Sequence, residues 1–462
     1  MATPHTAPTR ARRARSVPPW HVLPGLARDP VRALLGFGER AAGEVIRLNL
    51  GSFRPYLVTD PAHVQQVLGD RADNFGRAGD GPFWGPLRRL FGDGILSDGP
   101  AWSDSRRILQ PLFTARRVEA MMGGIAETIA DAVAELDAPA LAGRPVDIGA
   151  EQARIVCRAM MKALFADRIS VSDALRVIEA QDSIATSVIP RVLVPFVPLS
   201  LPMPGDRTFR EAVRRIDEVL VPIVRSARAT AAHGGDDIIS TLWRGTTDDG
   251  QPLDERQVRN DTVAMVAVTT ETTINVLTWL WPHLERSPEV AARLQEEIDQ
   301  VVGGDRVGPE HLPQLRYTRM VLDELIRLYP VAWLAPRQVV RSVSLGGVEL
   351  EEGATLLVSP LITQRLERYW ERPEVFDPDR FAPDRVRARH RYAFFPFGGG
   401  PHQCLGMHLF YLEAQLIVAN MLSRYRLRVH SPRLPTMQLA AALRTKDRVE
   451  LELRPTHPVG VA

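Results

Sequence analysis

Lysine is almost missing from this chain of 462 residues, because only Lys162 and Lys446 accompany its many arginines. An excess of one charge sign is also missing, since the formal net charge is only +2. The basic residues are scattered along the chain and are usually interleaved with acids, which a nucleic-acid-binding face would not be. We therefore do not expect nucleic-acid binding to be the main activity.

Cysteine is equally scarce. Only Cys157 and Cys404 occur, which excludes a disulfide framework and makes a reducing cytosol the natural setting. Cys157 lies in the apolar run Ile-Val-Cys-Arg-Ala-Met, which predicts a buried helical residue with a packing role.

Long apolar segments are absent from the first 19 residues, which are rich in Pro, Thr and Arg. They contain neither the apolar core of a signal peptide nor a membrane span of roughly 20 residues. We expect residues 1–19 to be a disordered tail and residues 20–462 to form a single domain. The protein is expected to be soluble and cytoplasmic, with no membrane anchor.

Helical periodicity dominates what is present, at about 101–328 and again at about 405–425. Short alternating segments at about 44–60 and 339–360 predict strands, so the expected fold is mainly α with smaller β-sheets. The Gly-rich stretch 74–100 is predicted to be a long loop. Five prolines within the apolar stretch 189–205 predict a crossover between helices, either packed on the core or acting as a lid.

The most informative stretch surrounds Cys404, in the run Phe-Pro-Phe-Gly-Gly-Gly-Pro-His-Gln-Cys-Leu-Gly from Phe395 to Gly406. Glycines permit a tight turn and a close approach of the backbone to a flat ligand. The helix predicted after it directs its positive N-terminal end at the sulfur, which favours a thiolate. A lone cysteine is usually a small core residue, but this setting favours an iron-bound thiolate.

Charged residues within apolar helices indicate further candidate sites for ion pairs and anion binding. Glu324 and Arg327 share one face of a buried helix, and Arg380 follows in a Pro-marked turn, so the three can form an ionic cluster. Trp102 and Arg106 lie four residues apart on a helix and suit a carboxylate or phosphate. Arg337 is a further candidate for that anion. A solvated surface position remains the alternative for each arginine alone.

A long apolar helix near residues 261–281 contains Val268-Thr269-Thr270-Glu271-Thr272-Thr273. Threonine hydroxyls can bond to the carbonyl three or four residues earlier, which bends helices. A hydroxyl-lined groove beside a metal could bind oxygen or water and relay protons. A Thr-rich amphipathic face explains the pattern equally well from the residues alone.

Together and in this order, these motifs resemble the cytochrome P450 superfamily of haem-thiolate monooxygenases, from Trp20 to the last predicted strand. The resemblance implies haem b between a long distal helix and the proximal Cys-loop helix, with Cys404 as the axial ligand to iron. It also implies roles for residues that fall on the family's motifs. The implied haem-binding residues are Trp102, Arg106, Arg337, Phe397, Gly398 and His402.

The same resemblance places Thr272 and Glu271 in proton delivery to oxygen, and Glu324, Arg327 and Arg380 in the family's ionic cluster. Val268 and Thr269 depart from the pattern, because these slots usually hold smaller residues. The groove is therefore expected to be narrower or differently hydrated. By the same likeness, the residues expected to line an apolar substrate pocket are Phe83, Trp84, Ile184, Val188, Val266, Val331, Trp333 and Leu334.

The resemblance implies that one oxygen atom is inserted into a hydrophobic small molecule, for which a terpene-like secondary metabolite is the leading hypothesis. Macrolides, aromatic polyketides and peptides are the other substrate classes. Electrons are expected from a separate ferredoxin- or flavodoxin-type donor with its reductase. Arg391 could belong to the docking patch for this donor. The alternative functions are an oxidative coupling or cyclising enzyme, a peroxygenase, and a haem-binding sensor without turnover.

Overall fold

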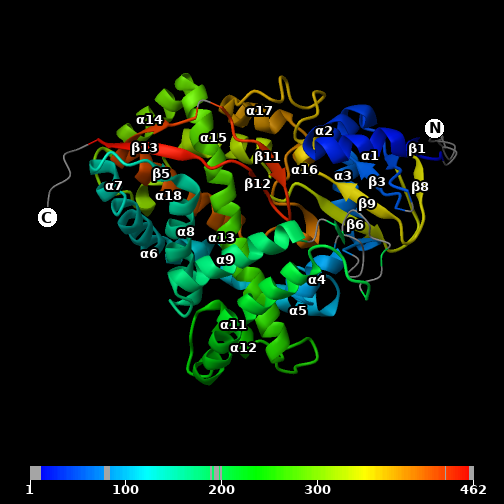
Figure 1. Cartoon of the computed structure of the whole chain (residues 1–462), viewed down its shortest axis with the longest axis horizontal. Coiled ribbons are helices and arrows are strands. Elements are labelled where there is room, and N and C mark those ends of the chain that lie inside the picture. The colour runs from blue at the N-terminus through cyan, green and yellow to red at the C-terminus, as the bar shows by residue number, and fades with distance from the viewer. Residues whose placement is uncertain are drawn as a thin grey trace, which may run out of the picture. The chain divides into compact units, whose positions relative to one another are not determined.

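The computed structural model describes residues 12–51, 53–77, 84–187, 190–191, 197, 200–431 and 433–456. Two compact units make up the chain (Figure 1). The first comprises residues 1–81, 332–373 and 389–403, and the second comprises residues 82–331, 374–388 and 404–462. The single domain predicted for residues 20–462 stays a prediction. The expected mainly helical chain with small sheets is confirmed.

The first unit is built on a six-stranded sheet in the order β1-β2-β3-β9-β6-β4. Its apolar core includes Val58, Leu356 and Phe395, all nearly without exposed surface. The hairpin expected near residues 44–60 is present, because β2 pairs antiparallel with β3. The elements of this unit are β1 (Arg15–Val17), α1 (Pro19–Arg28), α2 (Pro30–Ala41), β2 (Ile46–Leu48), β3 (Tyr56–Val58), α3 (Pro61–Gln65), β4 (Phe75–Gly76), β6 (Ala335–Val339), β7 (Val343–Leu345), β8 (Val348–Leu350), β9 (Thr355–Val358) and α16 (Pro360–Thr363).

The second unit is a helical assembly around α13, which packs against helices on several sides. A three-stranded sheet, β10-β13-β5, and the hairpin β11-β12 belong to the same unit. Its helices are α4 (Trp84–Phe91), α5 (Pro100–Leu109), α6 (Ala115–Ala134), α7 (Asp137–Leu141), α8 (Ile148–Phe165), α9 (Val171–Ser187), α11 (Asp206–Ala231), α12 (Ile238–Arg244), α13 (Glu255–Arg286), α14 (Pro288–Val302), α15 (Arg316–Leu328), α17 (Pro383–Ala388) and α18 (Met407–Arg424). Its strands are β5 (Val146–Asp147), β10 (Tyr425–Val429), β11 (Met437–Leu439), β12 (Leu443–Thr445) and β13 (Glu450–Pro455).

Helix α13 is long and apolar enough to cross a membrane, but 72% of its most apolar window is buried inside the protein. Asp254 caps its start by accepting a hydrogen bond from the Gln257 N–H. Burial on this scale identifies α13 as a core helix, so its apolar length reflects packing by other helices on many sides.

Two predictions about loops were wrong. Residues 15–17 of the expected tail form β1, which pairs in parallel with β2 and places Val17 in the core. A strand of three residues is too short for periodicity to reveal. The predicted loop 74–100 contains the helix α4, whose eight residues are flanked by glycines. Residues 1–11 and 78–83 lie outside the described part of the chain.

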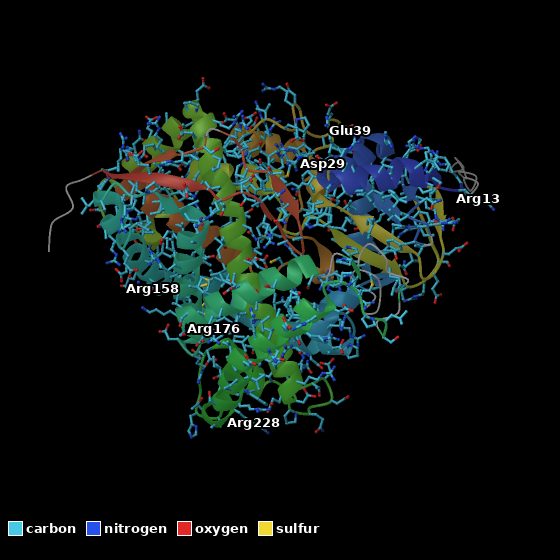
Figure 2. All side chains as sticks on the ribbon, viewed as in Figure 1. Arg13, Asp29, Glu39, Arg158, Arg176 and Arg228 are labelled. Carbon is cyan, nitrogen blue, oxygen red and sulfur yellow. The ribbon has the colours of Figure 1, made fainter. Side chains whose placement is uncertain are left out.

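Charged side chains cover the outside of both units (Figure 2). Arg176 of α9 lies 3.0 Å from Asp173 one turn earlier, and Arg158 of α8 pairs with Glu135. Neighbouring charges of opposite sign thus accompany arginines on the surface. Acids and bases that are interleaved in the sequence therefore pair with each other at the surface.

Candidate haem-thiolate site

The glycine-rich loop before Cys404 belongs to the first unit and needs glycine for steric reasons. Gly400 has a φ of +64°, and a Cβ there would lie 1.8 Å from the Leu68 carbonyl oxygen. The Phe395 N–H donates to Gln364 Oε1 at 3.0 Å and anchors the start of the loop. Phe397 is half-buried, and Gly398 also has a positive φ, of +70°. The backbone is therefore held in one tight path that a larger residue at position 400 would block.

Cys404 begins the last segment of the second unit, just before α18. The residue is exposed, although the surrounding protein atoms raise the pKa of its thiol by desolvation. The Gly406 amide and the charge of Arg106 favour the thiolate and offset part of this rise in pKa. The other cysteine, Cys157, is fully buried in α8, and burial raises its thiol pKa to about 12. Only Cys404 thus combines access with groups that stabilise a thiolate.

The predicted anion donors lie on separate elements. Trp102 and Arg106 lie four residues apart on α5, and Arg106 Nε donates to Gln110 Oε1 at 3.0 Å. In the first unit, Arg337 is buried on β6 and donates to the Pro336 carbonyl at 2.9 Å. His402 ends a short 3₁₀ turn that starts at Gly400. Arg106 and Cys404 both belong to the second unit, and they are close enough for their charges to interact.

Glu324, Arg327 and Arg380 meet in the second unit, at the place where α15 packs against the turn 378–381. Arg327 binds the Glu324 carboxylate through two nitrogens, at 2.6 and 2.9 Å, and neither side chain has exposed surface. Arg380 lies 3.4 Å from the same carboxylate, which also accepts a bond from the Asp377 N–H at 2.9 Å. The buried carboxylate therefore has donors on both oxygens.

The threonines of α13 divide into two groups. Thr269 donates to the Met265 carbonyl at 2.6 Å and Thr272 to the Val268 carbonyl at 2.9 Å, as expected for hydroxyls within a helix. The Thr273 hydroxyl instead bonds to a different helix, because it donates to Glu413 of α18 at 2.6 Å. The Thr269 hydroxyl is thus bound to its own helix, and Val268 and Thr272 are half-buried.

Glu271 lies within the same helix, and burial raises the pKa of its carboxyl to about 7. The charge of Asp182 on α9 acts in the same direction, and the charge of Arg444 on β12 opposes it. A carboxyl group with a pKa near neutrality can both hold and release a proton at physiological pH. Glu271 is therefore chemically suited to proton transfer.

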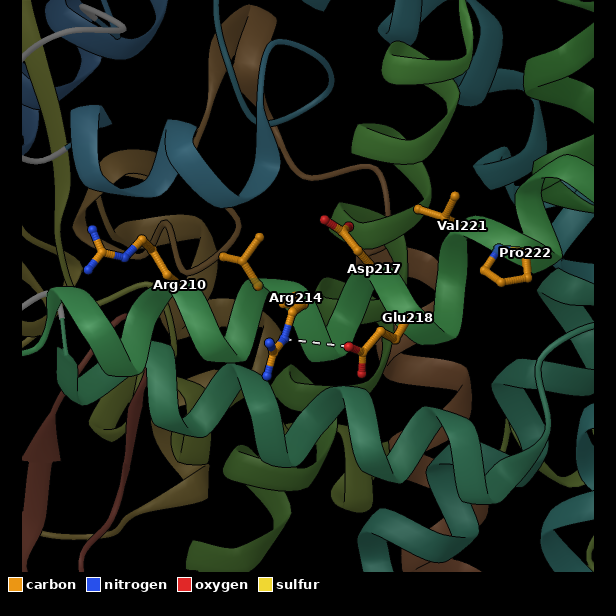
Figure 3. A pocket seen from close by; sticks show the side chains of 7 residues that line it. Arg210, Arg214, Asp217, Glu218, Val221 and Pro222 are labelled. Atoms are coloured by element: carbon orange, nitrogen blue, oxygen red, sulfur yellow. Dashed lines mark ion pairs between the residues drawn. The ribbon is translucent and has the colours of Figure 1, made fainter.

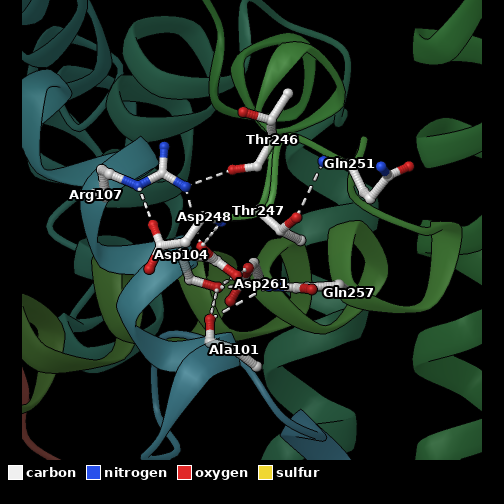
Figure 4. A network of polar contacts seen from close by, with 10 residues as sticks. Ala101, Asp104, Arg107, Thr246, Thr247, Asp248, Gln251, Gln257 and Asp261 are labelled. Carbon is white, nitrogen blue, oxygen red and sulfur yellow. Dashed lines mark hydrogen bonds and ion pairs between the residues drawn. The ribbon is translucent and has the colours of Figure 1, made fainter.

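Sequence reasoning missed two buried acids, Glu413 on α18 and Asp261 on α13. Glu413 was not singled out, although a lone acid in the apolar run of α18 was a usable signal. Asp261 accepts hydrogen bonds from the Ile95 N–H at 2.7 Å and the Ser105 hydroxyl at 2.6 Å. Figure 4 shows Asp261 near Ala101 and Gln257 within a network of polar contacts. Ser105 lies between Trp102 and Arg106 on α5, so Asp261 ties that helix to α13. No local pattern predicts this contact.

The predicted pocket residues are only partly within the described chain. Phe83 and Val188 lie outside it. In the second unit, Ile184 and Val266 are buried, and Trp84 and Val331 are half-buried. Trp333 and Leu334 are half-buried in the first unit.

A groove of about 450 Å³ lies elsewhere, along α11 (Figure 3). Arg214 and Glu218 form a 3.5 Å ion pair at its edge. None of the predicted pocket residues lines this charged groove. Its lining consists of Arg210, Val213, Arg214, Asp217, Glu218, Val221 and Pro222.

Comparison with known proteins gives consistent results. The family model for cytochrome P450 matches residues 37–453. Pentalenene oxygenase of Streptomyces avermitilis is 30% identical over 84% of this chain and 85% of its own length. Cyclooctat-9-en-7-ol 5-monooxygenase of Streptomyces melanosporofaciens is 31% identical over 84% and 83%.

The fold has a similar counterpart among solved structures. The haem domain of cytochrome P450DA superposes with a TM-score of 0.83, at 22% identity, over 97% of this chain and 99% of that one. An accessible thiol, an adjacent amide donor and a nearby arginine suit a cysteine ligand to haem iron. The chain therefore belongs to the cytochrome P450 family and is a monooxygenase that carries haem b bound through a cysteine.

Proposed function

We propose that Cys404 is the haem ligand and that the enzyme inserts one oxygen atom into a terpene-like hydrophobic substrate. The observation that carries the assignment of the ligand is the contrast between the two cysteines. Cys157 is enclosed in α8, whereas Cys404 is exposed and stands beside Gly406 and Arg106. Because Cys404 is the accessible one of the two cysteines, it is the candidate for the ligand.

The substrate class is supported by the relatives and by the character of the predicted pocket. Pentalenene oxygenase and cyclooctat-9-en-7-ol 5-monooxygenase carry the names of terpene substrates, and both match more than four fifths of the chain. The predicted pocket residues are aromatic or aliphatic, and such a lining selects shape more than functional groups. Both points favour a hydrophobic terpene over a peptide.

Haem bound through a thiolate supplies the oxygen activation, since the thiolate's electron density favours O–O cleavage. The residues of this chain bind the cofactor and supply protons. Trp102, Arg106, Arg337 and His402 would bind the haem carboxylates, and Phe397 and Gly398 would form the loop beside the ring. Glu324, Arg327 and Arg380 would hold the surrounding fold.

Protons would reach the oxygen side through Glu271 and Thr272. Glu271 has a carboxyl pKa of about 7, raised mainly by burial, and so exists in both forms near neutral pH. Thr272 donates its hydroxyl proton to the Val268 carbonyl, so its oxygen can accept a hydrogen bond from a water molecule that carries the proton onward. Thr269 makes the same kind of bond, to the Met265 carbonyl, but it is buried, whereas Thr272 is half-buried and directly follows Glu271.

Electrons would come from a separate ferredoxin- or flavodoxin-type protein with its reductase, in the cytoplasm. Arg391 is exposed beside the Cys404 loop in sequence and suits an acidic partner. An assay for products also distinguishes the alternative functions. These are oxidative coupling, peroxide-driven oxidation, and haem sensing without turnover.

The ligand is tested by the absorption spectrum of the reduced, CO-bound protein. We expect the wild type and Cys157→Ala to show the band typical of thiolate-bound haem, and Cys404→Ala to lose it. Retention of the band in Cys404→Ala would contradict the assignment.

The substrate class is tested by titrating the ferric protein with cyclic terpenes, macrolides and aromatic polyketides, and following the spin-state change of the haem. We expect a shift with at least one terpene and oxygenated product when a ferredoxin, its reductase and NADPH are added. Shifts with the other classes alone would exclude the terpene proposal, and turnover with peroxide alone would identify a peroxygenase.

A further inference from the structure

The hairpin β11-β12 brings an arginine to the same region as two acids from distant parts of the chain. Arg444 of β12 forms an ion pair with Asp182 of α9, across 262 positions of sequence. Its Nε donates to Gln438 Oε1 at 3.3 Å, and Gln438 is the residue paired with Arg444 across the hairpin. The Leu443 N–H donates to the Val331 carbonyl at 2.9 Å and anchors β12. Arg444 is therefore held in place from two sides.

Helix α13 packs against both α9 and β12, the two elements that carry this ion pair. The charges of both partners act on Glu271: Asp182 disfavours its carboxylate and Arg444 favours it. Among the described residues, these are the charged groups that act on Glu271 from the elements packed around α13. Glu179, one turn before Asp182 on α9, acts on Asp182 itself. The protonation of Glu271 is therefore influenced by one neighbouring acid and one neighbouring arginine.

The ion pair also runs from solvent toward the interior. The Asp182 side chain is 53% exposed, whereas that of Arg444 is 17% exposed, so Asp182 is the solvent end. Next to Asp182 in the sequence, both side-chain amide atoms of buried Gln181 lack a hydrogen-bonding partner among the described residues. Buried polar atoms of this kind are commonly satisfied by ordered water.

We propose that Asp182 and Arg444 are positioning residues for proton delivery: their opposite charges together set the charge of Glu271, and the pair marks the hydrated route by which Glu271 is reprotonated from solvent. This proposal rests on the proposed role of Glu271 in the monooxygenase. Each proton that Glu271 releases toward bound oxygen is replaced by one from water along this route. Arg444 itself carries no proton, because its guanidinium stays charged, so its part is electrostatic.

The test is an infrared titration of the ferric holoenzyme, in which Glu271→Gln identifies the C=O band of the protonated Glu271 carboxyl. We expect Asp182→Asn to move the titration midpoint down and Arg444→Gln to move it up, each by about one pH unit. The double variant should return close to the wild-type midpoint. Asp173→Asn on α9 and Arg448→Gln next to β12 are matched controls and should leave the midpoint unchanged.

The second readout is turnover. The pH profile of kcat should move in the same direction as each midpoint, and both variants should form less product per NADPH with a larger solvent deuterium effect. Midpoints that stay fixed, or that move in the same direction in both variants, would overturn the proposal and indicate a merely structural pair. Midpoints that move while the kcat profile does not would also overturn it, because Glu271 would not be the donor. The thiolate band of the CO complex, unchanged in all variants, separates these outcomes from failure of the haem-thiolate function.

Discussion

Thr273 on α13 donates a hydrogen bond of 2.6 Å to Glu413 on α18, and both side chains are almost completely buried. The helix that carries the proposed proton donor is thereby bonded to the helix that follows Cys404. The second carboxyl oxygen of Glu413 has no hydrogen-bonding partner among the described residues. A buried carboxyl with one donor and no cation is more stable in its protonated form.

This pair predicts a pH-dependent stability. Burial raises the pKa of Glu413 to about 8 from 4.5. A group whose pKa is higher in the folded state contributes stability that is complete below about pH 4.5 and is lost as pH rises to 8. We expect Glu413→Gln to remove this dependence, which is worth at most about 5 kcal/mol. Denaturant unfolding at pH 5 and pH 8.5 measures it. Glu349→Gln, an exposed position, is the control, and an equal pH response in both variants would contradict the prediction.

The buried ion pair predicts a large loss when one partner is removed. Arg327→Ala leaves the Glu324 carboxylate buried with fewer donors, and we expect a cost of about 3–5 kcal/mol. Arg327→Lys should recover little, because one ammonium cannot replace two nitrogens bound at 2.6 and 2.9 Å. Arg293→Ala removes an exposed partner of Asp379 and should cost about 1 kcal/mol or less. Urea unfolding of the three variants gives the values, and similar losses for Arg327→Ala and Arg293→Ala would refute the assignment.

The Cys404 loop predicts a steric requirement at Gly400. We expect Gly400→Ala to lower the haem content of the purified protein severalfold, because the new Cβ would collide with the Leu68 carbonyl. Gly347→Ala is the matched control, since Gly347 also has a positive φ, of +77°, but has nothing within 4 Å of the added atom. The pyridine haemochrome assay measures the content. Equal losses in both variants would attribute the effect to backbone strain alone.

The contact of Asp261 with residues 94 and 95 predicts a further effect of a glycine. A Cβ on Gly94 would lie 2.3 Å from Asp261 Oδ1, so Gly94→Ala should displace the loop and cost about 1–3 kcal/mol. Gly124→Ala adds a Cβ to open space on α6 and should be neutral or stabilise by up to about 1 kcal/mol. Thermal unfolding of both variants compares them. A Gly94→Ala protein as stable as the wild type would show that the loop is not held by Asp261.

The sequence by itself determined the features that depend on neighbouring residues. The apolar periodicity determined the mainly helical fold, and the spacing of Glu324 and Arg327 placed both on one helix face. The tight turn before Cys404 could be predicted from the sequence, because the need for glycine in such a turn is steric and local. Periodicity failed where an element is short, as in β1 and α4, because three to eight residues carry too few repeats.

Only the tertiary structure decided which distant groups meet. Asp182, Glu271 and Arg444 belong to three elements separated by long stretches of chain, and nothing near any of them in sequence indicates the other two. The same holds for Thr273 with Glu413, and for Asp261 with Ser105. Burial and charge act through space, so the protonation of these acids is a property of the packed protein. Local sequence supplied the acids, and packing determined their pKa values.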